Sequence, residues 1–224
     1  MNLSIEWTYR IPGDPRTVTL ISNPIPVAHV LTVLKDMEKT GRVKNIEFID
    51  EKGAYWTKKE IEKYLKSLET EPHEVIAYFD GGFNKEKNSA GLGGVIYFKK
   101  NHRSYRLRKN LYLEHISSNN EAECAALWFL LNEIENLGIH HRELTIHGDS
   151  HVIINQLQGD WPCYEEVLNR WLDRIQKKIS DLGLTINFCA ISRQENKEAD
   201  QLAGQALRGE SVSALKDLNE GDQA

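Results

Sequence analysis

Residues 117–127 read SSNNEAECAAL and place two acids in the first turn of a predicted helix. After Asn120, apolar residues recur at helical spacing until Gly138, a residue that favours the end of a helix. Glu121 and Glu123 are two positions apart, so at helical pitch their side chains point in different directions. One acid is favourable at a helix N-terminus because of the helix dipole, but the second acid needs another explanation.

The segments on both sides of this helix predict a sheet. Before the helix, apolar runs are typical of strands in an antiparallel meander, and they occupy residues 74–82, 91–98 and 104–113. After the helix, strand patterns at 143–150 and 184–192 alternate with helix patterns at 151–157, 164–183 and 196–207. The residues after Arg208 have few apolar anchors, so we expect a flexible tail at 209–224.

Four acids lie where these predicted strands end or helices begin. Asp80 ends the first strand and Asp149 ends the fourth, while Glu123 and Asp200 lie in the first turns of two helices. Strand ends and helix starts can converge on one edge of a sheet. Four unpaired carboxylates would repel each other strongly, so a divalent cation at their centre is expected. Hard oxygen ligands favour Mg²⁺ or Mn²⁺.

Each acid taken alone also has an ordinary structural explanation. Asp80 before two glycines is typical of a turn, and Asp149 before a serine is typical of a helix N-cap. Glu123 could serve a helix dipole, and Asp200 could be a solvated acid. Their order along the chain, each on a fitting element, favours the metal site.

Four motifs give the chain a resemblance to a known family. The stretches YFDGG (78–82), SNNEAE (118–123), GDS (148–150) and ENKEADQLA (195–203) resemble those of type 1 ribonuclease H. The resemblance extends over residues 74–208 and points to the bacterial branch called ribonuclease H-like or reverse-transcriptase-like, with an extra N-terminal domain. It implies an α/β fold with a mixed five-stranded sheet flanked by helices, whose first three strands are antiparallel.

The resemblance also implies a reaction and its residues. The activity would be metal-dependent cleavage of the RNA strand in an RNA–DNA hybrid, leaving 5′-phosphate and 3′-hydroxyl ends. Asp80, Glu123, Asp149 and Asp200 match the catalytic carboxylates that hold two Mg²⁺ ions, or Mn²⁺. Glu121 is left to serve the helix start and the solvent. The residues expected to contact the substrate are Gly81, Gly82, Ser118, Asn119, Asn120, His151, Arg193 and Asn196.

Three features depart from the family pattern. Many relatives carry a histidine in the loop before the last helix, whereas this loop has Arg193 and no histidine. His151 stands where relatives often have glutamine. The segment 156–166 is short and not basic, so a basic helix found in some relatives is missing. These departures bear on hybrid affinity and rate more than on the type of reaction.

Composition limits the setting in which the chain works. The formal net charge of −5 excludes general attraction to nucleic acid, so binding depends on local geometry or on metal ions. Three scattered cysteines suit a reducing compartment better than a disulfide framework. The N-terminus has no signal-peptide pattern, and no apolar run approaches the ~20 residues that span a bilayer. We therefore expect a cytoplasmic protein without a membrane segment.

The first 70 residues predict a separate small α+β domain. Strand patterns at 3–10, 16–22 and 43–50 accompany two helices, and Thr57 with Glu60 forms a capping box for the second helix. Residues 1–72 contain 11 Lys and Arg against 11 Asp and Glu, so this part offers no net electrostatic attraction to nucleic acid. Aromatic residues could stack on substrate, although core packing is the expected fate of at least Trp7; they are Trp7, Tyr9, Tyr55 and Trp56. Docking on the catalytic domain or on a protein partner is the alternative role.

Two other functions fit the same fold. A non-catalytic nucleic-acid-binding module would have no reason to keep four mutually repelling acids. A DNA nuclease of the transposase or resolvase kind would normally bring additional basic DNA-binding domains, which are not evident here. The hybrid-cleaving enzyme is therefore the favoured prediction.

Overall fold

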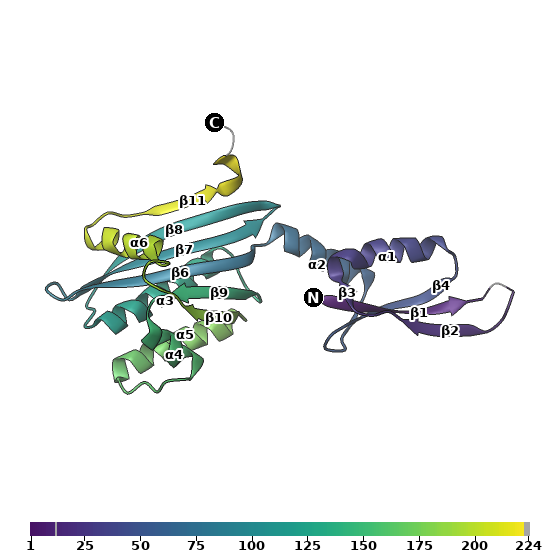
Figure 1. Ribbon diagram of the computed structural model, residues 1–224, viewed down its shortest axis with the longest axis horizontal. Helices are drawn as coiled ribbons and strands as arrows, with labels where there is room; N and C mark the ends of the chain where they lie inside the picture. Colours follow the sequence, from purple (N-terminus) through teal and green to yellow (C-terminus); the bar gives the residue numbers. More distant parts are fainter. Residues whose placement is uncertain (12, 222–224) are drawn as a thin grey trace. The chain divides into compact units, whose positions relative to one another are not determined.

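The computed structural model describes residues 1–11 and 13–221, and it divides the chain into two compact units. Unit 1 is Met1–Leu68 and unit 2 is Glu69–Ala224 (Figure 1). Each unit has its own hydrophobic core. Among the described helices, none combines the length and the apolar character that a membrane crossing requires.

Unit 1 is a small antiparallel sheet with helices packed on one face. Its strand order is β2-β1-β4-β5, and β3 also pairs with β1. Strand β1 alternates between core and outer face, which buries Leu3 and Ile5 against α1, where Val30 and Leu34 are buried. The elements are β1 (Asn2–Arg10), β2 (Thr17–Ile21), β3 (Ile25–Pro26), α1 (Val27–Lys39), β4 (Val43–Asp50), β5 (Tyr55–Trp56) and α2 (Lys58–Thr70).

The predicted capping box at the start of α2 is confirmed. The Thr57 backbone N–H donates to Glu60 Oε2 at 2.7 Å, and the Glu60 N–H donates to Thr57 Oγ1 at 3.2 Å. The two-residue strands β3 and β5 were not predicted because two residues carry no periodicity.

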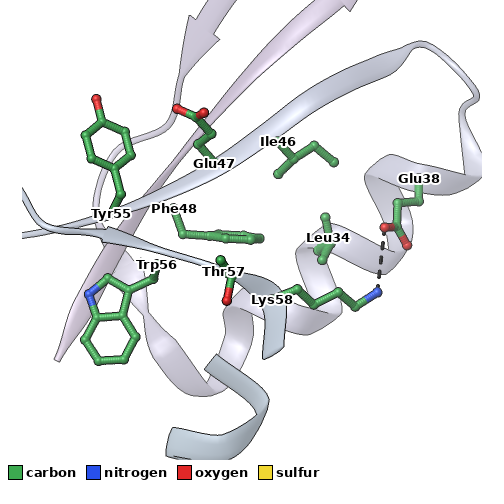
Figure 2. Close-up of a pocket in the computed structure, with 9 residues that line it drawn as sticks. All are labelled: Leu34, Glu38, Ile46, Glu47, Phe48, Tyr55, Trp56, Thr57 and Lys58. Carbon is green, nitrogen blue, oxygen red and sulfur yellow. Dashed lines mark ion pairs between the residues drawn. The ribbon is translucent and has the colours of Figure 1, made fainter. Parts of the chain in front are cut away.

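Unit 1 also holds a pocket of about 650 Å³ between α1 and the β4–β5 edge (Figure 2). Its wall includes Leu34, Ile46 and Phe48, and Lys58 pairs with Glu38 across it at 3.7 Å. Tyr55 lies beside it and is 66% exposed.

The other aromatic residues proposed for stacking are more constrained. Trp7 packs against the core of unit 1, as the alternating pattern predicted. Trp56 also packs there and donates its indole N–H to Asp50 at 3.0 Å. Tyr55 is therefore the most exposed aromatic side chain of the set.

Unit 2 is a mixed sheet with helices on both faces. Its strand order is β10-β9-β6-β7-β8-β11, in which β6, β7 and β8 are antiparallel while β9 and β10 run parallel to β6. This confirms the predicted antiparallel start and mixed sheet. The elements are β6 (His73–Asn84), β7 (Ser89–Lys100), β8 (Arg103–Glu114), α3 (Asn119–Asn136), β9 (Glu143–Gly148), α4 (His151–Gln158), α5 (Glu166–Asp181), β10 (Thr185–Ala190), α6 (Lys197–Leu207), β11 (Ser213–Asp217) and the 3₁₀ helix η1 (Leu218–Gly221).

The sheet has a sixth strand, which corrects the predicted flexible tail at 213–217; residues 222–224 of that predicted tail lie outside the described residues. Strand β11 pairs antiparallel with β8, so residues 213–217 are part of the sheet (Figure 1). The chain is fixed there by Asn110, whose Oδ1 accepts from the Val212 N–H at 2.7 Å and whose Nδ2 donates to Glu210 O at 2.9 Å. Strand β11 is almost entirely exposed, and even Leu215 is 57% exposed. The sequence of this segment therefore has no alternation of buried and exposed residues from which a strand could be predicted.

Glycines allow helices to approach the sheet closely on both faces. A Cβ on Gly81 would overlap the Ala122 backbone of α3. A Cβ on Gly93 would overlap the Ala199 carbonyl of α6, which lies on the opposite face. Consequently Glu123 and Asp200, each one residue beyond these contacts, lie close to the strand that carries Asp80.

Candidate metal centre

Three of the four predicted acids meet beside β6 and β9, two neighbouring strands in the interior of the sheet. Asp80, Glu123 and Asp149 each offer a carboxylate oxygen, and these oxygens lie within 4.8 Å of one another. Strands β6 and β9 are parallel neighbours with Tyr78 opposite His147, so Asp80 and Asp149 stand level with each other, two residues further along. The close packing of α3 on β6 brings Glu123 beside them.

Asp200 lies at the rim of this cluster. Its carboxylate is not in the tight group of three, but its charge is near enough to raise the pKa of Asp80. Arg193 Nε is 3.6 Å from Asp200 Oδ1 and 3.9 Å from Asp149 Oδ2, so this arginine bridges the two acids. The Asp200 side chain is 48% exposed, and it faces the site from the side open to solvent.

The buried acids have strongly raised pKa values. Burial, followed by the charges of Asp149 and Asp200, raises the pKa of Asp80 to about 7. Burial, followed by the charges of Asp80 and Asp149, raises the pKa of Glu123 to about 9. Arg193 opposes both shifts without cancelling them.

These acids fit a divalent cation. The buried Oε2 of Glu123 has no hydrogen-bond partner, which leaves an acceptor aimed at no donor of the described chain. All the converging ligand atoms are carboxylate oxygens, the type that Mg²⁺ and Mn²⁺ prefer. A cation placed among them would relieve the repulsion that raises the pKa values.

Glu121 serves the start of α3, as predicted, but it does not face the solvent. Ser118 is the N-cap and its Oγ accepts from the Glu121 N–H at 3.1 Å. Glu121 Oε2 in turn accepts from the Ser117 N–H at 2.8 Å, and Oε1 accepts from the Trp171 indole at 3.2 Å. Burial opposes ionisation of this carboxyl, yet these hydrogen bonds outweigh it and lower its pKa. The expectation of a solvated Glu121 is therefore corrected: only 8% of the residue is exposed.

The predicted substrate residues divide by exposure into accessible side chains and residues that are covered by helices or buried in the core. Those with accessible side chains near the acids are Asn119, His151 and Arg193, which are exposed, and Ser118 and Asn120, which are half-buried. Gly82 is half-buried beneath α6. Gly81 is buried under α3, so the prediction that its backbone approaches RNA is corrected.

Asn196 is also corrected. Its side chain is 1% exposed and its Nδ2 donates to the Phe79 carbonyl at 2.9 Å. The amide therefore ties the loop before α6 to the residue preceding Asp80, and it is not available to a substrate. The partner is a backbone atom 117 residues away, which no local pattern reveals.

Sequence reasoning missed a second cluster, around Glu198. This residue, two positions before Asp200, contacts Tyr97, Arg106 and Arg108 on the sheet. The two arginines alternate in the strand pattern YRLRK, which places both on one face and could have indicated a shared partner.

The fold agrees with comparisons to known proteins, and the residues matched by a family model include all four acids. Residues 78–206, more than half of the chain, match the family described as reverse transcriptase-like. An uncharacterized protein of Bacillus subtilis (strain 168), YpeP, is 43% identical over 188 residues, which is 84% of this chain and 83% of that protein.

Solved ribonucleases H resemble about three-fifths of the chain. Ribonuclease H1 of the halophilic archaeon Halobacterium salinarum is 25% identical, with a TM-score of 0.53 over 61% of this chain and 99% of its own. The N-terminal ribonuclease H domain of Rv2228c from Mycobacterium tuberculosis is 26% identical, with a TM-score of 0.53 over 61% and 95%.

LC11 ribonuclease H1, solved in complex with an RNA/DNA hybrid, is 25% identical, with a TM-score of 0.54 over 61% and 98% of the two chains. The extended family match and these structures lead to the same assignment. This chain belongs to the reverse transcriptase-like family, and its second unit has the ribonuclease H fold.

Proposed function

We propose that this protein is a metal-dependent endoribonuclease that cleaves the RNA strand of RNA–DNA hybrids and leaves 5′-phosphate and 3′-hydroxyl ends. The fold and the acidic cluster support a nuclease. The observation that carries the proposal is the convergence of Asp80, Glu123 and Asp149 within 4.8 Å, with Asp200 at the rim. Binders have no use for carboxylates that repel each other in the absence of a cation.

Asp80, Glu123, Asp149 and Asp200 would hold the divalent cations. When bound, such ions would supply Lewis acidity, which would activate a water for attack on the phosphate and stabilise the charge on the leaving oxygen. The chain's own contribution is position: Asp80 and Glu123 are buried on packed elements, so their oxygens are fixed before the cation arrives. Their raised pKa values mean that protons must leave as the cation binds.

The accessible side chains near the acids would bind the hybrid. Arg193 is 81% exposed, so its guanidinium can leave Asp149 and Asp200 and pair with a phosphate. Asn119 and Asn120 lie at the start of α3 and offer amides to sugar or base edges. Recognition of RNA would depend on 2′-hydroxyl groups in a wide, shallow minor groove. That LC11 ribonuclease H1 was solved with a hybrid supports this choice of substrate.

One assay tests the proposal. The protein is incubated with Mg²⁺ or Mn²⁺ and labelled RNA–DNA hybrid, duplex DNA, duplex RNA or single-stranded RNA. We expect cleavage of the hybrid alone, and loss of that cleavage in Asp149→Asn. Tight hybrid binding without cleavage would indicate a binding module, and cleavage of duplex DNA would indicate another nuclease of this fold. Either result would overturn the proposal.

A further inference from the structure

Three side chains from the sheet converge on Glu198 in the first turn of α6. Tyr97 Oη donates a hydrogen bond to Glu198 Oε2 at 2.8 Å. Arg106 Nη1 and Arg108 Nε form ion pairs with Glu198 Oε1 at 3.1 and 2.9 Å. The Glu198 carboxylate thus binds two guanidinium groups and one phenol hydroxyl. We call Glu198, Tyr97, Arg106 and Arg108 the Glu198 cluster.

The strand register explains why these residues meet. Tyr97 on β7 lies opposite Arg106 on β8, and Arg108 is two residues further along β8, so all three side chains share one face of the sheet. That face is the one on which α6 lies. The charged side chains are between 27% and 30% exposed, so solvent screens them less than it screens a fully exposed pair. Burial and the bond to Glu198 both raise the pKa of Tyr97, which keeps it a donor.

Asp200 depends on the helix for its position more than the other acids do. Asp80 and Glu123 are each 5% exposed and belong to elements in the middle of the core. The Asp200 side chain is 48% exposed, and its ion-pair partner Arg193 is itself 81% exposed. The first turn of α6 therefore sets where the Asp200 carboxylate lies.

That first turn has no side-chain cap of the usual kind. Asn196 occupies the N-cap position, but its amide bonds to the Phe79 carbonyl instead of capping the helix. Asn110 holds α6 further along, through Nδ2 to Leu202 O at 3.0 Å. Between these two anchors, the close packing of Ala199 on Gly93 holds the first turn of α6 to β7, and the Glu198 cluster adds polar contacts to both β7 and β8.

We propose that Glu198 is a positioning residue, which holds the first turn of α6 so that Asp200 reaches the cations bound by Asp80, Glu123 and Asp149. Glu198 and Asp200 are two positions apart on the helix, so their side chains point in different directions. Glu198 contacts the sheet, and Asp200 faces the other acids. The inference deepens the proposed function, but its main consequence is for cation binding and does not require catalysis.

A matched ion pair provides the control. Glu133 on α3 accepts from Lys109 Nζ at 2.7 Å, and Lys109 lies on β8 next to Arg108. This pair also joins a helix to the same strand, and its glutamate side chain is 11% exposed. It lies on the α3 face, away from α6. Glu133→Gln therefore removes a comparable ion pair without loosening Asp200.

The test measures Mn²⁺ and Mg²⁺ binding by calorimetry, well below the melting temperatures of the variants. We expect Glu198→Gln to raise the half-saturating Mn²⁺ concentration about tenfold, the lower end of what the loss of a supporting contact costs a metal site. Glu133→Gln should stay within about twofold of the parent, although both variants lose stability. In hybrid cleavage at fixed Mg²⁺, Glu198→Gln should lower kcat with little change in KM.

Two outcomes would overturn the inference: unchanged cation binding in Glu198→Gln, or an equal loss in Glu133→Gln. If Glu198→Gln does not fold, Tyr97→Phe removes one hydrogen bond from the cluster and should raise the half-saturating concentration by a smaller factor; no rise would count against the inference. A parent that binds Mn²⁺ with this pattern yet cleaves no hybrid would contradict the proposed function and leave the role of Glu198 supported.

Discussion

Replacing Glu123 by glutamine should stabilise the cation-free protein while abolishing its function. The buried carboxyl has a usual pKa of 4.5 and a pKa of about 9 in the folded chain. At pH 7 the folded form keeps a proton that the unfolded chain releases, and at 1.36 kcal/mol per pH unit the difference of 2.5 units costs about 3 kcal/mol. A buried glutamine left partly unpaired costs about 1 kcal/mol. The net gain is about 2 kcal/mol at pH 7.

The dependence on pH identifies the cause of that gain. Because the folded state holds the proton more tightly than the unfolded state, the stability of the cation-free parent falls as pH rises from about 4.5 towards about 9. Glu123→Gln removes this loss, so its advantage should be near zero at about pH 5 and should grow with pH. Thermal unfolding in EDTA across this range measures it, and a gain of about 2 kcal/mol corresponds to roughly 4–8 °C at this chain length.

Glu121→Gln is the control, two residues away on the same helix. The Glu121 carboxylate accepts hydrogen bonds from Ser117 and Trp171, which lower its pKa against the effect of burial. Its replacement should therefore destabilise the protein by about 1–2 kcal/mol while leaving cleavage nearly unchanged. Mg²⁺ should stabilise Glu121→Gln as it does the parent, but Glu123→Gln much less. A Glu123→Gln variant that is less stable than the parent at high pH in EDTA would refute the reasoning.

Four further predictions concern cleavage and binding. Asp149→Asn should abolish cleavage while circular dichroism and hybrid affinity stay near those of the parent; a rate close to that of the parent would remove Asp149 from the site. At saturating Mg²⁺, where Asp80 and Glu123 have released their protons, the pH–rate profile should lack a limb near the ~6.5 typical of histidine. A limb at saturating Mg²⁺ that disappears in His151→Ala would show that this residue takes part. Arg193→Ala should raise KM for the hybrid up to about fivefold, the worth of an exposed ion pair, and an unchanged KM would exclude a phosphate contact. If unit 1 grips the hybrid through its exposed ring, Tyr55→Ala should weaken binding by about tenfold, as the loss of one stacked base does, and unchanged affinity on long hybrids would count against such a grip.

The parts of the fold that the sequence predicts are those with a repeating burial pattern. Strand β6 buries Val75, Ala77 and Phe79 on one face, and this period of two is visible in the sequence. Strand β11 has no such pattern, because its residues are held by backbone pairing with β8 and by the Asn110 side chain. An exposed edge strand is stabilised by partners that lie far away in the sequence, so local periodicity cannot find it.

The candidate site divides in the same way. The four acids follow from residue type and from their order along the chain. The prediction that Asp80 ends its strand is wrong, because β6 continues to Asn84. The partners of Glu121 and Asn196 do not follow from the sequence, because Trp171 and the Phe79 carbonyl come near only when α5 and β6 have packed. A polar side chain next to a motif can therefore be read as a substrate contact when its actual partner is another part of the chain.

Close packing and charge repulsion oppose each other at this site. Glycines at 81 and 93 let α3 and α6 lie directly on the sheet, which forces Glu123 and Asp200 towards Asp80. Looser packing would let the carboxylates separate and would lower the cost of keeping them ionised, but it would also spread the ligands. The Glu198 cluster and the Asn196 amide stabilise the close packing, because both hold α6 against the strands. A cation bound among the acids would remove the repulsion, so the arrangement that is least favourable without the metal is the one that binds it best.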